Sequence, residues 1–223
     1  MEVLQLLSAT IRFGKKEVLK KISFTVETGE ILGVFGRNGC GKSTLLKMIF
    51  GSLKKGSVNI SMNGKTFNVH ENISSERIAY LPQHSFVPRN LKVRDLIPLY
   101  FLEEQKQDVI FYDTLISKIT ANKVRDLSLG QVRYLEVLLV GNLNHDFLML
   151  DEPFSMIEPL YKIEIKKLLN KLKFEKGIII TDHYYQDVLD ISSQNLLIEN
   201  GVSIPIKGKE DLKRLHYLSK NSI

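Results

Sequence analysis

The segment that most constrains this 223-residue chain is a glycine-rich stretch between an apolar run and a helical pattern. The run Ile31–Phe35 is typical of a buried strand, and Lys42–Phe50 has helical spacing. Such a loop lets backbone N–H groups point at a phosphate, while its lysine and the start of the helix add positive charge. We therefore expect ATP to be held by residues that fit G-x-x-x-x-G-K-[ST] and the next position: Gly36, Arg37, Asn38, Gly39, Cys40, Gly41, Lys42, Ser43 and Thr44.

Other apolar runs indicate a layered α/β core. Runs typical of buried strands cover Ile78–Leu81 and residues 147–150 and 178–180. Residues 131–143 and 160–172 have helical spacing, and residues 93–119 are mainly helical in pattern. Strands that alternate with helices predict a mainly parallel sheet. Residues 3–11, 22–26 and 58–62 are further strand candidates, which we assign to an antiparallel β subdomain.

Two carboxylates end the apolar strand at residues 147–150. Asp151 and Glu152 follow it directly. Beside a phosphate loop, Asp151 would hold Mg²⁺ together with the Ser43 hydroxyl, and Glu152 would polarise the attacking water. Many strands end in acids, so this pattern gains its meaning from the glycine-rich loop upstream.

With these motifs the chain resembles the nucleotide-binding subunit of ATP-binding cassette (ABC) transporters, over nearly its whole length. The resemblance implies that Phe13 stacks on adenine. It implies that Gln83 senses Mg²⁺ and the γ-phosphate, and that the switch histidine His183 contacts the γ-phosphate. Asp151 and Glu152 match the metal-associated aspartate and the catalytic glutamate.

The same resemblance implies a P-loop NTPase core with an inserted α-helical lobe. We expect one domain over residues 1–223, with the core at 1–83 and 145–223 and the lobe at about 84–144. The lobe would carry a signature loop, which matches Ser128, Leu129, Gly130 and Gln131. A dimer-interface loop would contain Ser155 and Glu158.

In this family two subunits form a head-to-tail dimer, and each ATP lies between one phosphate loop and the partner's signature loop. The resemblance therefore implies a homodimer or heterodimer that drives a separate membrane permease. Residues 88–99 are the expected contact with that permease. No run approaches the roughly 20 apolar residues of a membrane span, so we expect a cytoplasmic protein on the inner face of the membrane. The net charge of +6 is spread along the chain, and no nucleic acid is expected.

Two positions depart from the family pattern. Leu129 stands where the signature loop usually has its first glycine, and Glu158 stands where the interface loop usually ends in aspartate. A β-carbon at Leu129 would restrict the backbone and add bulk near the partner. We therefore expect normal ATP binding but slow hydrolysis by a homodimer. Cys40, the only cysteine, lies beside Lys42 and a helix start, which predicts a lowered thiol pKa.

Two alternatives to a transport ATPase stay open at this point. One is a soluble ABC ATPase that acts without a permease, for example in cluster assembly. The other is a nucleotide-gated regulatory module with little hydrolysis. Neither the transported substrate nor the direction of transport is contained in these motifs.

Overall fold

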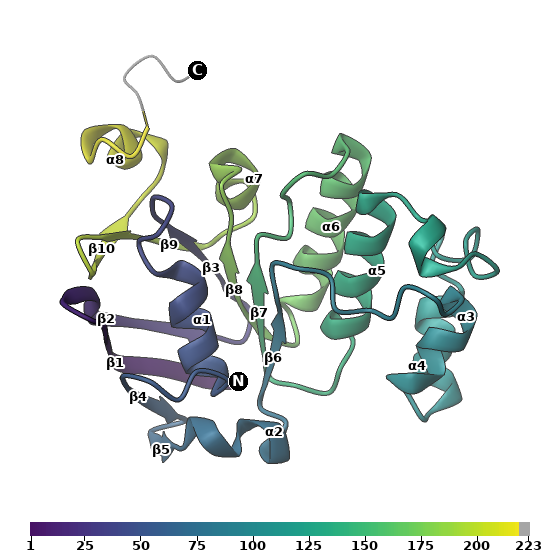
Figure 1. Ribbon diagram of the computed structural model, residues 1–223, viewed down its shortest axis with the longest axis horizontal. Coiled ribbons are helices and arrows are strands. Elements are labelled where there is room, and N and C mark those ends of the chain that lie inside the picture. Colours follow the sequence, from purple (N-terminus) through teal and green to yellow (C-terminus); the bar gives the residue numbers. More distant parts are fainter. Residues whose placement is uncertain (219–223) are drawn as a thin grey trace.

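The structure is a computed structural model that describes residues 1–218. Within that range the strands join one sheet in the order β5-β4-β1-β2-β10-β9-β3-β8-β7-β6. Strands β9, β3, β8, β7 and β6 pair in parallel, while β1 pairs antiparallel with β2 and β4. The predicted parallel core and antiparallel part are thus both present (Figure 1). The strands are β1 Val3–Phe13, β2 Lys16–Glu27, β3 Ile31–Phe35, β4 Ser57–Met62, β5 Lys65–Phe67, β6 Ile78–Leu81, β7 Phe147–Asp151, β8 Gly177–Thr181, β9 Gln194–Glu199 and β10 Val202–Ile206.

Helices cover both faces of the parallel strands, because successive side chains of a strand point to opposite faces. Met149 belongs to the core that contains α1 (Lys42–Phe50). Its neighbour Leu148 belongs to the core that contains α5 (Leu129–Gly141) and α6 (Pro159–Leu172). Figure 1 shows α1 and the α5–α6 pair separated by strands β6 to β8. The two cores explain why β3, β7 and β8 are buried at every position.

The stretch predicted as mainly helical, residues 93–119, contains only short helical pieces. Asp113 Oδ1 accepts hydrogen bonds from the backbone N–H groups of Leu115 (2.9 Å) and Ile116 (3.1 Å), which favours a turn over a continued helix. The pieces are α3, a 3₁₀ turn and α4, which span Val93–Leu96, Ile97–Leu99 and Glu104–Phe111.

Helix α5 begins two residues before the predicted start at residue 131. Ser128 caps its N-terminus, and the Ser128 and Gln131 side chains each bond the other's backbone N–H. This capping box satisfies two N–H groups that would otherwise lack partners. Because α5 lies in the predicted lobe but shares its buried core with β7, the division between lobe and core remains a prediction.

Strands β9 and β10 were not predicted, since their runs are short and include polar residues and Pro205. No helix in the part of the chain that the structure describes is long and apolar enough to cross a membrane. The remaining elements are 3₁₀ turns at Val69–Glu71 and Val124–Asp126, and helices α2 Asn72–Ser75, α7 Tyr185–Leu189 and α8 Lys209–Arg214.

Candidate functional site

The glycine-rich loop connects β3 to α1, as the sequence predicts. Gly36, Gly39 and Gly41 have φ values of 156°, 75° and 108°, which side-chain-bearing residues rarely adopt. Lys42 is buried, and its Nζ donates to the Gly36 carbonyl at 2.6 Å. The ammonium therefore lies inside the curve of the loop, where a phosphate would lie against the backbone N–H groups.

Asp151 ends β7 beside this loop and is almost fully buried. Its Oδ1 accepts hydrogen bonds from Ser43 Oγ at 3.1 Å and Thr181 Oγ1 at 2.7 Å. Its Oδ2 accepts one from the Tyr80 hydroxyl at 3.1 Å. Ser43 and Asp151 thus present neighbouring oxygen donors, the ligand type that Mg²⁺ prefers.

The described residues contain no group of three His, Cys, Asp or Glu side chains that could hold a metal by themselves. Mg²⁺ at nucleotide sites usually takes one or two carboxylate ligands, and substrate phosphates and water complete its coordination.

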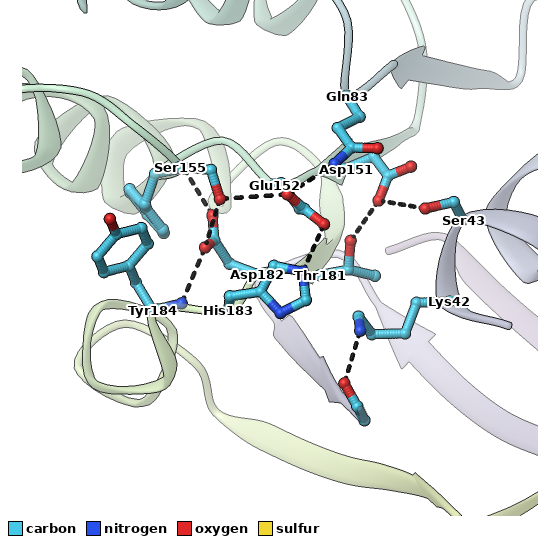
Figure 2. A network of polar contacts seen from close by, with 12 residues as sticks. Lys42, Ser43, Gln83, Asp151, Glu152, Ser155, Thr181, Asp182, His183 and Tyr184 are labelled. Atoms are coloured by element: carbon cyan, nitrogen blue, oxygen red, sulfur yellow. Dashed lines mark hydrogen bonds and ion pairs between the residues drawn. The ribbon is translucent and has the colours of Figure 1, made fainter. Parts of the chain in front are cut away.

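Glu152 is the centre of a second polar cluster (Figure 2). Its Oε2 accepts hydrogen bonds from Gln83 Nε2 at 2.9 Å and Ser155 Oγ at 3.3 Å. Its Oε1 lies 2.8 Å from His183 Nε2. The structure therefore brings Gln83, Glu152 and His183 together, although they come from three distant parts of the chain.

The phosphate loop and this cluster line one cavity of about 280 Å³. Its size and charged lining suit the phosphate end of a nucleotide. The described residues that line it are Asn38, Gly39, Gly41, Lys42, Ser43, Thr44, Gln83, Glu152 and His183.

The signature loop does not line that cavity in the described part of the chain. Gln131 caps its own helix, and Leu129 is 67% exposed. Leu129 lines instead an adjoining cavity of about 320 Å³, together with Met156 and Ile157, and this cavity shares Gln83 and Glu152 with the phosphate cavity. Leu129 is the first residue of α5 and has no positive φ, so its β-carbon does not restrict the backbone as expected; only the added bulk remains.

Phe13 ends β1 and is 43% exposed, so it is not a core aromatic. The ammonium of Lys55 lies 5.0 Å from the centre of its ring. Arg37 points away from the phosphate cavity, because its Nη2 donates to the His216 carbonyl at 2.7 Å. Adenine stacking on Phe13 stays a prediction.

The expected lowering of the Cys40 pKa is wrong. Burial raises the pKa of this thiol and outweighs the opposing charge of Lys42. The sequence showed the nearby cation but could not show that the side chain is packed against the Gly36 backbone.

Sequence reasoning did not single out Asp182. It is fully buried, and it accepts hydrogen bonds from the Phe154 N–H (2.7 Å), Ser155 Oγ (3.1 Å) and the Tyr184 N–H (2.9 Å). Burial raises the pKa of this carboxyl. Asp182 thereby joins the loop that carries His183 to the interface loop, and only its position next to His183 could have indicated this.

Comparisons with known proteins agree with this geometry. Residues 19–155 match the sequence model of the family described as ABC transporter. The chain is 29% identical to the lipopolysaccharide export system ATP-binding protein LptB of Haemophilus influenzae, over 92% of both chains. It is 30% identical to the protein of that name from Escherichia coli K12, over 90% of this chain and 91% of the relative.

Solved structures show the same fold. A structure described as the ATP binding subunit of an ABC transporter has a TM-score of 0.82 and 20% identity, and the match covers 99% of this chain and 95% of the other. A nucleotide-free ATP-binding cassette from an ABC transporter has a TM-score of 0.81 and 23% identity, with 99% and 97% covered.

Proposed function

Because the chain belongs to the ABC transporter family and is an ATP-binding, ATP-hydrolysing subunit of such a transporter, we propose that it works as a head-to-tail dimer with Mg²⁺. The observation that carries this proposal is the division of the site. Among the described residues, Gln83, Glu152 and His183 line the phosphate cavity, whereas Ser128 and Gly130 of the same chain do not line it. A second chain in head-to-tail contact would bring its Ser128 and the Gly130 N–H to the γ-phosphate.

Within one chain, different residues would bind the phosphates, hold Mg²⁺ and orient the attacking water. The backbone of the phosphate loop and Lys42 would hold the β- and γ-phosphates, and Ser43 and Asp151 would hold Mg²⁺. Mg²⁺ supplies neutralisation of charge on these phosphates. Glu152 would orient the attacking water, with Gln83 and His183 at the γ-phosphate end of the cavity.

The dimer would drive a separate membrane-spanning subunit and lie on the inner face of the membrane. Relatives named as the ATP-binding protein of an export system support such a division of labour. An exposed apolar surface after Gln83 supports it further: Phe86 is 38%, Leu99 68% and Leu102 97% exposed. Recognition of the cargo would then belong to the membrane subunit.

Mixing two inactive variants tests the composite site. Lys42→Ala removes phosphate binding, and Ser128→Arg blocks the signature loop. A head-to-tail heterodimer of the two variants keeps one intact site. The unaltered phosphate loop of the Ser128→Arg chain meets the unaltered signature loop of the Lys42→Ala chain. We expect ATPase activity to reappear on mixing. If each chain hydrolyses ATP alone, the mixture stays inactive.

Introducing a charge into the apolar surface tests the membrane contact. Leu102→Glu should leave ATPase activity of the purified chain unchanged but release the protein from the membrane fraction of the cell that makes it. Ile73→Glu is the matched control, because Ile73 is 78% exposed on α2, which lies apart from α3 and α4 (Figure 1). If Leu102→Glu and Ile73→Glu bind the membrane fraction equally, this surface is not the contact with the membrane subunit.

A further inference from the structure

Arg133 on α5 has a buried guanidinium with several backbone partners. Nη1 donates to the Pro82 carbonyl at 2.8 Å. Nη2 donates to the carbonyls of Asp151 at 2.6 Å and Glu152 at 3.2 Å. One side chain thus reaches the residue before Gln83, the last residue of β7 and the residue that follows it, which a planar fork of donors can do.

The backbone that Arg133 holds is strained. Glu152 has a φ of 56°, in the left-handed region that a glutamate rarely adopts. Such a conformation persists only where its surroundings fix it. Here the Glu152 N–H donates to the Thr181 carbonyl at 2.7 Å, and the Glu152 carbonyl accepts from Arg133. The backbone conformation from which the Glu152 side chain extends therefore depends on these two contacts.

A buried partner extends the network toward the exposed apolar surface. Glu136, one turn along α5, lies 3.3 Å from Arg133 Nη1 and is almost fully buried. Its other oxygen, Oε1, accepts a hydrogen bond from the Phe86 N–H at 3.0 Å. The pair consequently links the segment after Gln83 to the backbone of Glu152.

We propose that Arg133 is a positioning residue for ATP hydrolysis, which fixes the backbone of Glu152 and ties it to the segment that follows Gln83. The proposal rests on the role proposed above for Glu152. A buried ion pair contributes little net stability compared with apolar side chains of similar volume. Its value here lies in geometry, since misplacement of a reacting group by about 1 Å costs roughly a hundredfold in rate.

Arg133→Lys is the decisive variant. Lysine keeps the charge beside Glu136, but its single ammonium cannot reach the carbonyls of Pro82, Asp151 and Glu152 together. We expect kcat to fall by about tenfold or more, while KM for ATP changes less than about twofold. Arg77→Lys is the matched control, because Arg77 pairs with Glu2 and Asp146 away from the site and should leave kcat unchanged.

A second variant separates positioning from stability. Arg133→Met with Glu136→Leu replaces the buried pair by apolar side chains, so the thermal midpoint should approach that of the wild type. We expect kcat to stay low. If the double variant recovers both kcat and the thermal midpoint, the proposal is overturned. A wild-type kcat in Arg133→Lys would overturn it too. So would a parallel loss of ATP binding and turnover in Arg133→Lys and the double variant.

Glu152→Gln shows which idea fails. If this variant retains turnover, the proposed role of Glu152 is wrong. If it loses turnover while Arg133→Lys keeps it, only the inference about Arg133 is wrong.

Discussion

The carboxylate of Glu158 lies against Gly130 within the same chain, so the interface loop and the signature loop are in direct contact. A β-carbon built on Gly130 would overlap Glu158 Oε2 and the ring of Tyr161. Tyr161 also packs beside Tyr134 of α5, with ring centres 6.4 Å apart. The signature loop and the interface loop, which are both predicted to contact a partner subunit, therefore pack against each other within one subunit.

Gly130→Ala should destabilise the protein. The added methyl group has no space beside Glu158 and Tyr161, and overpacking of this kind costs about 1–3 kcal/mol. We expect a lower thermal midpoint in calorimetry and reduced ATPase activity. Gly208→Ala is the control, since a β-carbon there meets no atom within 4 Å and its φ of 168° is extended. A Gly130→Ala protein as stable as the control would contradict the contact.

Leu129→Gly should raise the ATPase activity of the homodimer several-fold, because the exposed side chain adds bulk where the partner's nucleotide is expected. Since Leu129 already has helical geometry, Leu129→Ala should give an equal gain without the flexibility of glycine. Steady-state phosphate release measures both variants. If neither variant exceeds the wild type, the leucine does not limit turnover.

Cys40 should react slowly with maleimides at pH 7–8 and faster as the pH rises above 9. Its raised pKa leaves little thiolate at neutral pH, and the thiolate is the nucleophile. Complete modification should block ATP binding, and bound ATP should slow the reaction. Cys40→Ala, which removes the only cysteine, should bind ATP and take up no reagent. Unchanged ATP binding after full alkylation would refute this.

Tyr80→Phe should weaken the dependence of nucleotide binding on Mg²⁺, because more Mg²⁺ is then needed for the same effect. The lost hydroxyl bonds Asp151 Oδ2, while the ring contact with Phe50 at 5.4 Å is kept. We expect several-fold more Mg²⁺ to be needed for half-maximal nucleotide binding, with Mg²⁺-free ATP binding unchanged. Tyr134→Phe is the control, because that hydroxyl bonds Asp113 in the region of α4 instead. Equal Mg²⁺ dependence in both variants would show that Tyr80 does not orient Asp151.

Elements whose signal is local were predicted well. β3 and α1 have the expected bounds, since an apolar run, positive-φ glycines and helical spacing act over neighbouring residues. The region of α3 and α4 was predicted less well, because the Asp113 turn competes with the helix through a side-chain hydrogen bond that spacing does not reveal.

The sequence by itself determined the α/β core and the glycine-rich loop between β3 and α1, and it predicted that Lys42, Ser43, Asp151 and Glu152 serve ATP. Those features follow from fixed spacings along the chain. The tertiary structure decided which groups meet: Glu152 with Gln83 and His183, Arg133 with the backbone of Glu152, and Glu158 with Gly130. It also reversed the expected direction of the Cys40 pKa, because burial and contacts between distant segments exist only once the chain has packed.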